Sequence, residues 1–230
     1  MDSTQPQHTN RQYEEELRGL RAGLLKMGGL VERQIAEAVE SLVQRNTAQA
    51  RETIARDAEV NRMDVDSDER CIRLLALHQP AASDLRFLTT GLKITTDLER
   101  IGDNAVNICE RAIELNEEPQ LKPYIDIPRM AAIAQSMVKD SLDAFMRDDT
   151  VLAEEVIDRD DEVDQLNYQI YRELLSYMAE DPTTITCATR ILFVSKYLER
   201  IADHATNIAE MVVYMVKGRT IRHMDKKQRP

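Results

Sequence analysis

The 230-residue sequence has no tryptophan, three phenylalanines, and only seven glycines and seven prolines. Long β-strands favour aromatic and β-branched residues and end at glycine-rich turns, so this shortage argues against a strand-rich fold. Alanine, leucine, isoleucine, arginine and glutamate dominate instead, and most of these are good helix formers. With 43% hydrophobic and 31% charged residues, the chain has enough apolar side chains for a packed core. We therefore expect an all-α fold.

The sequence also lacks basic character and long apolar runs. Its formal net charge is −11, which excludes a general nucleic-acid binder because such proteins need a basic surface. No apolar run approaches the roughly 18 residues of a membrane span, so direct membrane insertion is not expected. The first twelve residues are polar and lack the hydrophobic core of a signal peptide. These features predict a cytoplasmic protein.

Cysteine is scarce as well. Cys71, Cys109 and Cys187 stand singly within helical patterns, without a Cys-x-x-Cys pair. An odd number of isolated cysteines argues against disulfides and zinc knuckles. We expect all three to be reduced, small, buried apolar residues.

Hydrophobic residues recur every three or four positions in six long segments, which predicts six helices. Their boundaries are Asn46-Thr47, Gln79-Pro80, the proline-bearing linker 116–128, Asp148-Asp149 and Asp181-Pro182. A fourth helix is predicted to begin at about Arg129 and the last to stop near Gly218. This order predicts two related three-helix bundles, spanning residues 1–120 and 121–230, the second ending in a basic tail that we expect to be mobile.

The two halves share sequence as well as pattern. Residues 98–108 (LERIGDNAVNI) and 198–208 (LERIADHATNI) agree at most positions with an offset of one hundred. A weaker echo, one helix earlier, relates residues 56–61 to 159–164. Such strings at corresponding places indicate an internal duplication.

Each copy carries an acidic face beside its core seam. Residues four positions apart lie on the same face of a helix, and four such polar pairs form the candidate site: Glu99 with Asp103, Glu199 with Asp203, Asp57 with Asn61, and Asp160 with Asp164. Like charges at this spacing repel by a few tenths of a kcal/mol. Either Arg100 and Arg200 neutralise them or a cation does, and the spacing leaves both open. Oxygen donors without cysteine or histidine suit magnesium, manganese or iron.

Catalytic patterns are missing. None of the four histidines follows a glutamate by three positions, which counts against a ferritin-like di-iron protein. We expect His204 to lie on the surface or outside the first ligand shell. There is no glycine-rich phosphate loop or nucleophile elbow. We expect no enzyme; a ferritin-like metal protein and a purely structural helical adaptor stay as alternatives.

At the two repeated acidic segments, and at residues 79–87 (QPAASDLRF), the sequence closely resembles the PhoU family of phosphate-specific transport accessory proteins. The resemblance implies a cytoplasmic protein of two pseudo-symmetric three-helix bundles, often a homodimer. It also implies negative regulation of the phosphate-starvation response. The implied partners are the phosphate ABC transporter, through its PstB-like ATPase subunit, and a PhoR-like sensor histidine kinase.

The resemblance further implies divalent or multinuclear metal sites, with iron, zinc, manganese or magnesium. The family's Glu/Asp-x-x-x-Asp motif is matched by Glu99/Asp103, Glu199/Asp203 and Asp160/Asp164. Asp57/Asn61 departs from it, because an amide stands where an acid is usual. We therefore expect unequal sites, with weaker or different metal binding in the first bundle.

Overall fold

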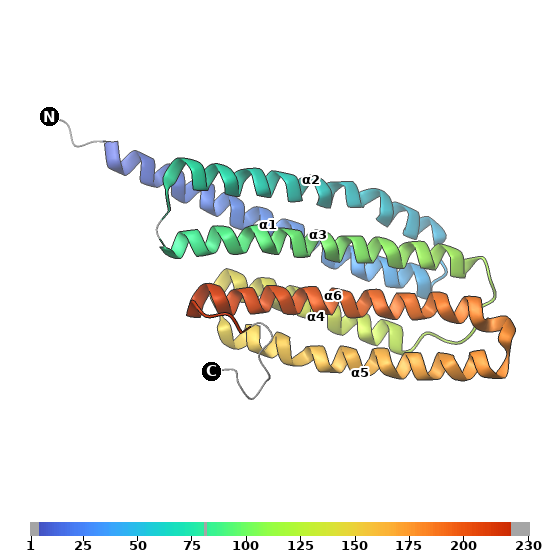
Figure 1. The fold of residues 1–230 in the computed structure, drawn as a ribbon. Helices are drawn as coiled ribbons and strands as arrows, with labels where there is room; N and C mark the ends of the chain where they lie inside the picture. The colour runs from blue at the N-terminus through green and yellow to red at the C-terminus, as the bar shows by residue number, and fades with distance from the viewer. Residues whose placement is uncertain (1–4, 81, 222–230) are drawn as a thin grey trace.

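The computed structural model describes residues 5–80 and 82–221, which form six long α-helices and one 3-10 helix, with no strand in these ranges. The helices run along one common axis in two layers (Figure 1), with α1, α2 and α3 in one layer and α4, α5 and α6 in the other. The predicted all-α fold of two three-helix bundles is confirmed. The elements are α1 (Gln5–Val43), α2 (Thr47–His78), α3 (Ala82–Asn116), α4 (Asp126–Arg147), α5 (Thr150–Glu180), η1 (Pro182–Thr184) and α6 (Ile185–Lys217).

The two bundles share one continuous hydrophobic core. Helix α3 packs along α6, and α1 packs along α4. All the predicted seam residues of α3 and α6, from Phe87 to Ala112 and from Ile191 to Met215, are buried. A helix that is apolar on two sides must be covered on both, so α3 and α6 form the centre of the molecule. The division into domains at residue 120 stays a prediction from the repeat.

Local sequence signals mark the start of α2 and α5 and the end of α6 where they were predicted. The Asn46 side chain accepts a hydrogen bond from the Gln49 amide, and that of Asp149 accepts from two amides of the first turn of α5. These are N-caps, which satisfy amides that have no partner within the helix. Gly218 follows α6 with a left-handed φ of 67°, a conformation that glycine adopts without strain.

One predicted boundary is wrong. Helix α4 begins at Asp126, three residues before the predicted start at Arg129. Pro128 therefore lies inside its first turn, where a missing N–H costs nothing because those amides have no helical partner. The predicted mobile tail runs from Arg219 to Pro230, and its residues 222–230 lie outside the described residues.

Arginines tie α3 to α6 at both ends of this antiparallel pair. Arg86, in the first turns of α3, donates from Nε to the Met215 carbonyl oxygen at 3.0 Å near the end of α6. Arg190, near the start of α6, lies 2.9 Å from Glu114 in the last turn of α3. It also lies 2.5 Å from Glu118, just beyond the end of α3. A cation near a helix C-terminus is favourable because carbonyl groups are exposed there.

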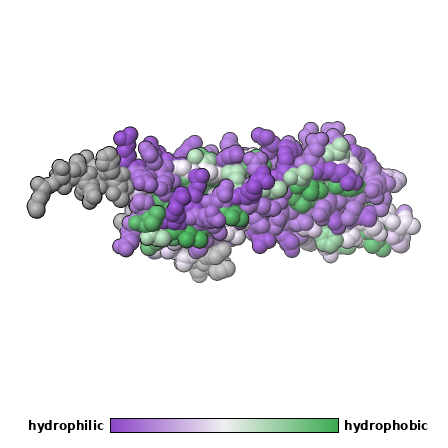
Figure 2. All heavy atoms as spheres, turned by 90° about the horizontal axis from the view of Figure 1, so that it is seen from above, coloured by the Kyte–Doolittle hydropathy of each residue, from purple (hydrophilic) through white to green (hydrophobic). Residues whose placement is uncertain are grey.

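The predicted cysteine environment is confirmed, since Cys71, Cys109 and Cys187 are buried and unpaired. Burial raises the pKa of the Cys71 and Cys109 thiols to about 12, which makes them unreactive. Among the described residues, none of the helices has the length and apolar character needed to cross a bilayer. The face seen in Figure 2 is largely hydrophilic, with small scattered apolar areas.

Candidate functional site

The duplication extends to the ion pairs between the first two helices of each bundle. In α1 and α2, Lys26 pairs with Glu59 and Arg56 with Glu37, both at 3.0 Å. The contacts at positions 103 residues later are Arg129 with Glu162 at 3.2 Å and Arg159 with Asp140 at 2.6 Å. The register of α2 on α1 is therefore repeated by α5 on α4, which makes Asp160 the counterpart of Asp57.

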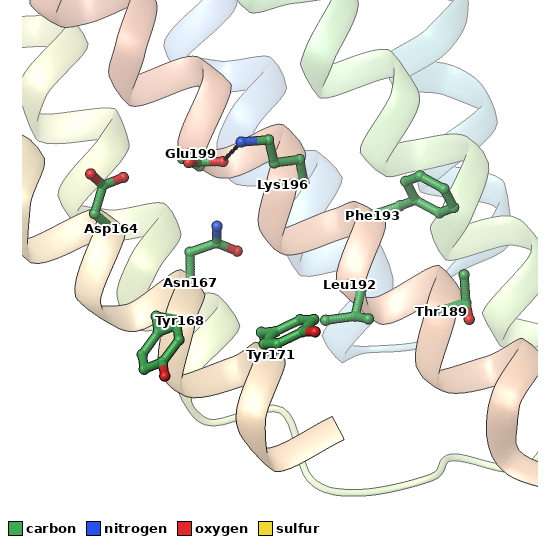
Figure 3. Close-up of a pocket in the computed structure, with 9 residues that line it drawn as sticks. All are labelled: Asp164, Asn167, Tyr168, Tyr171, Thr189, Leu192, Phe193, Lys196 and Glu199. Atoms are coloured by element: carbon green, nitrogen blue, oxygen red, sulfur yellow. Dashed lines mark ion pairs between the residues drawn. The ribbon is translucent and has the colours of Figure 1, made fainter. Parts of the chain in front are cut away.

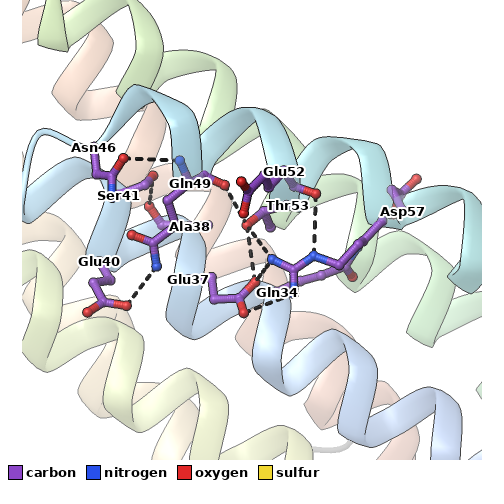
Figure 4. Close-up of polar contacts among 11 residues, drawn as sticks. Gln34, Glu37, Ala38, Glu40, Ser41, Asn46, Gln49, Glu52, Thr53 and Asp57 are labelled. Carbon is purple, nitrogen blue, oxygen red and sulfur yellow. Dashed lines mark hydrogen bonds and ion pairs between the residues drawn. The ribbon is translucent and has the colours of Figure 1, made fainter.

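In the first bundle, Asp57 is held by amide groups. Its Oδ1 accepts from Gln34 Nε2 at 3.1 Å (both residues are labelled in Figure 4). Its Oδ2 accepts from Asn61 Nδ2 at 3.0 Å. Gly102 on α3 permits this approach, because a Cβ there would lie 3.2 Å from Asp57 Oδ1. Both carboxylate oxygens of Asp57 thus have neutral donors, and Asn61 serves as one of them.

Glu99 and Asp103 on α3 share one arginine. Arg100 Nε lies 3.4 Å from Glu99 and Arg100 Nη1 lies 3.2 Å from Asp103. Partial burial raises the pKa of Glu99 first, the charge of Asp103 raises it further, and Arg100 opposes both. The sequence left open whether an arginine or a cation neutralises this acid pair. In the described structure, Arg100 lies beside both acids.

A further acid of this cluster, Asp64, was missed from the sequence. Burial, then the charge of Asp68, raises the pKa of Asp64, while Arg100 lowers it. The charge of Asp64 also raises the pKa of Glu99. The available signal was the stripe of polar residues at 57, 61, 64 and 68 of α2, whose spacing places them on one helix face.

The second bundle assembles its acids with less compensation. The pKa of Asp160 is raised to about 6, first by burial and then by the charges of Asp203 and Asp164. A contact with the Thr206 side chain opposes this rise. The pKa of Asp164 and that of Asp203 are also raised, in both cases by burial first and by Glu199 next. The structure therefore brings together all four acids predicted on α5 and α6 (Asp160, Asp164, Glu199 and Asp203) into one coupled group.

Two differences between the bundles concern the partners of their acids. The position of Gln34 in the repeat is occupied by the buried, apolar Met137, which has no amide to donate. Glu199 pairs with Lys196 (Figure 3), whereas Arg200 forms no ion pair within the described part of the chain. The two clusters therefore differ in their contacts: amides and Arg100 compensate the first, and one lysine borders the second. Unequal metal binding stays a prediction.

The donor set of the second cluster fits a hard or borderline divalent cation, because it consists of carboxylates, and three of them, Asp160, Asp164 and Asp203, have raised pKa values. Zinc fits less well, since it favours cysteine and histidine nitrogen and sulfur donors. In residues 5–80 and 82–221, no three acidic, cysteine or histidine side chains lie close enough to share one ion. Metal binding would therefore require side-chain rotations, and it stays a prediction.

His204 lies outside the group of four acids, in agreement with the second of the two predicted positions, and it is not on the open surface. Its side chain is 24% exposed, and Nδ1 lies 2.8 Å from Asp97 Oδ1 of α3. It thus points across the interface between the bundles, because it follows Asp203 by one residue and so lies about 100° around the helix.

Comparisons with known proteins give a consistent result over the length of the chain. A model of the PhoU domain matches residues 24–112 and 127–212. Two proteins named "Phosphate-specific transport system accessory protein PhoU homolog" are similar to the chain: one from Pseudomonas putida, 42% identical, covering 96% of this chain and 87% of that protein, and one from Aquifex aeolicus, 45% identical, covering 94% and 97%.

Two crystal structures are similar as well. PhoU from Pseudomonas aeruginosa matches with a TM-score of 0.87 and 42% identity, over 90% of this chain and all of that one. The phosphate transport system regulatory protein PhoU from Streptococcus pneumoniae matches with a TM-score of 0.85 and 29% identity, over 90% and 98%.

Proposed function

The chain belongs to the PhoU domain family, and we propose that it represses the phosphate-starvation response when phosphate is plentiful. As a member of this family it is an accessory and regulatory protein of phosphate transport and not an enzyme. The finer proposal is that it links a PstB-like ATPase subunit of the phosphate ABC transporter to a PhoR-like sensor histidine kinase. It would act in the cytoplasm, as a homodimer.

The coupled acids of α5 and α6 support this proposal most directly. Asp160, Asp164 and Asp203 all have raised pKa values, so their ionised forms repel one another and favour a cation or a cationic partner group. A folded chain retains such a cluster at a cost in stability, which is typical of a binding site.

A divalent cation, when bound, would offset part of the negative charge of these carboxylates. Asp160 and Asp164 on α5 with Glu199 and Asp203 on α6 would hold it, fixing the spacing of the two helices. The first bundle already has Arg100 in this role, so its face stays formed without a cation. Regulation then proceeds through partner binding, with no covalent step.

The test removes both acidic faces. Glu99→Ala/Asp103→Ala and Glu199→Ala/Asp203→Ala are introduced separately and together, and elemental analysis of the purified proteins is paired with a phosphate-starvation reporter in cells. We expect the α6 pair to lose more metal than the α3 pair, and the fourfold variant to derepress the reporter in high phosphate. Unchanged metal content and unchanged repression in the fourfold variant would contradict the proposal.

A structural adaptor is the second candidate, and the contacts of Arg100 favour it for the first bundle. In that case the α3 acids only stabilise their own helix surface through an exposed ion pair. The Glu99→Ala/Asp103→Ala variant would then change stability slightly and leave repression intact, while the Glu199→Ala/Asp203→Ala variant decides the metal question independently.

A further inference from the structure

An aromatic groove lies between α5 and α6, beside the acidic cluster of the second bundle (Figure 3). It encloses about 470 Å³. Tyr168 and Tyr171 project from α5, and Leu192 and Phe193 come from α6. One end is bordered by Asp164, Glu199 and Lys196. We refer to these side chains together as the α5–α6 groove.

The rings of this groove are exposed. Tyr168 is 63% exposed, and Tyr171 and Phe193 are each 46% exposed. Scattered apolar residues are ordinary on a protein surface, but several aromatic rings gathered in one concave site indicate a contact surface.

The α5–α6 groove is also held in shape. The ring of Phe193 stacks on Tyr197 at 6.2 Å between centroids. Behind the rings, the Ser195 hydroxyl donates to Asn167 Oδ1 at 2.9 Å, joining α6 to α5. A preformed aromatic surface loses little side-chain freedom when it binds a partner.

The duplication provides an internal comparison. At the repeat positions of Tyr168, Tyr171 and Phe193, the first bundle has Val65, Asp68 and Lys93. Leu192 is matched by Leu92, so the aliphatic floor is shared. The three rings are therefore a property of the second bundle alone and do not follow from the packing that both bundles require.

From this geometry we propose that the α5–α6 groove binds a cationic amphipathic helix of a partner protein. The apolar face of that helix lies on Tyr171, Leu192 and Phe193, as in helix-in-groove recognition. Its lysine or arginine side chains reach Asp164 and Glu199 at the acidic end. Tyrosine faces also attract such cations, and Arg172 already lies 5.9 Å from the Tyr168 ring.

Charge selects this occupant. The chain carries a net charge of −11, and Asp164 and Glu199 border the groove, so an acidic helix is repelled and a basic one is attracted. A second copy of this acidic chain is disfavoured for the same reason. The proposal rests on the proposed function in one respect: the natural partner is a component of phosphate signalling.

The direct test uses a fluorescein-labelled helical peptide of about 18 residues, with leucine on one face and lysine on both flanks, and measures its binding to the full chain by fluorescence anisotropy. The groove variant is Tyr171→Ser/Phe193→Ser. The matched control is Asp68→Ser/Lys93→Ser, at the repeat positions of these two residues in the first bundle, which leaves the net charge unchanged. We expect the groove variant to bind at least about tenfold more weakly and the control to change less than about twofold.

A peptide with glutamate in place of lysine is expected to bind at least about tenfold more weakly than the lysine peptide. Circular dichroism establishes that each variant is folded. Equal binding by wild type and a folded groove variant would overturn the proposal, as would equal binding of the two peptides.

A second measurement separates this proposal from the proposed function. The purified transporter ATPase subunit and the cytoplasmic part of the sensor kinase are each titrated against wild type, groove variant and control. Loss of binding only in the groove variant supports both ideas. If the groove variant binds as well as wild type does, the groove proposal alone is contradicted. If wild type binds neither protein, the proposed function is contradicted, and the peptide experiment still tests the groove proposal.

Discussion

His204 Nδ1 of α6 lies 2.8 Å from Asp97 Oδ1 of α3, so this contact crosses the interface between the two bundles. Both side chains are mostly buried, at 24% and 16% exposed. At the repeat position of His204, the side chain of Asn104 donates to the Arg100 carbonyl oxygen of its own helix at 2.7 Å. The two copies of the motif therefore make different bonds from the same position.

Removing either partner of this contact should destabilise the protein. We expect Asp97→Ala and His204→Ala each to lower the free energy of unfolding by about 1–2 kcal/mol, because a mostly buried polar group loses its partner. The double variant should cost less than the sum of the two. Denaturant unfolding of the four proteins measures the coupling; strict additivity would show that the two side chains do not interact.

Gly28 and Gly29 of α1 form a matched pair, because Gly28 is buried against α4 and Gly29 is exposed. A Cβ on Gly28 would clash with Cδ1 of the buried Leu142, whereas a Cβ on Gly29 meets nothing within 4 Å. Alanine gains about 0.8–1 kcal/mol over glycine in a helix interior. We expect Gly29→Ala to raise the free energy of unfolding and the melting temperature. We expect Gly28→Ala to have a free energy of unfolding about 1–3 kcal/mol lower than that of Gly29→Ala, because its extra methyl group overpacks the contact with Leu142. Equal stability of the two variants would contradict this packing.

Asp160→Asn should stabilise the protein near neutral pH. In the folded chain the pKa of Asp160 is about 6, above its ordinary value of 3.8. The folded state therefore binds the proton more tightly, and the stability that this group contributes is full below pH 3.8 and is lost as the pH rises through 6. Because solvent screens this half-buried carboxylate, we expect a gain of about 1 kcal/mol for the amide at pH ~7.5.

The same experiment has an internal check on sign. The advantage of Asp160→Asn should shrink as the pH falls through 6 and vanish near 3.8. Urea unfolding across this range measures it, with Asp66→Asn at an exposed position of α2 as control. A variant less stable than wild type at neutral pH would show that the ionised carboxylate has a favourable partner.

Arg100 should compete with cations in the first bundle. We expect Arg100→Gln to raise manganese affinity about two- to fivefold, since the interaction of an exposed ion pair is worth up to about 1 kcal/mol. Arg200→Gln is the matched control, because Arg200 pairs with no described acid, and it should change affinity less. Isothermal titration with manganese measures both. Identical binding by the two variants would argue that Arg100 does not occupy a cation position.

The helices could be predicted because each carries its own information. Apolar residues at three- and four-residue spacing in α3 and α6, from Phe87 to Ala112 and from Ile191 to Met215, are all buried as predicted. The caps at Asn46 and Asp149 depend only on residues within one turn. The start of α4 was misplaced because proline, a strong helix breaker elsewhere, is tolerated within the first turn.

The partners of the acids could not be predicted. The sequence places Glu99 and Asp103 on one face, but it does not say that Arg100 folds back over both. Nor does it reveal that Gln34 of another helix donates to Asp57. Such contacts depend on the rotation of each helix about its axis and on side-chain rotamers, which distant residues decide.

The sequence by itself determined the six helices, the duplication and the two acidic faces, because these follow from spacing along one chain segment. The sequence also shows that the copies differ at Asn61, but only the tertiary structure decided which contacts each copy makes. It placed His204 against Asp97 between the bundles, gave Asp57 two amide donors, and placed Asp164, whose pKa is raised, at one end of an aromatic groove. The reason is physical: burial and charge coupling depend on which helices pack together, and residues far apart in the sequence supply those neighbours.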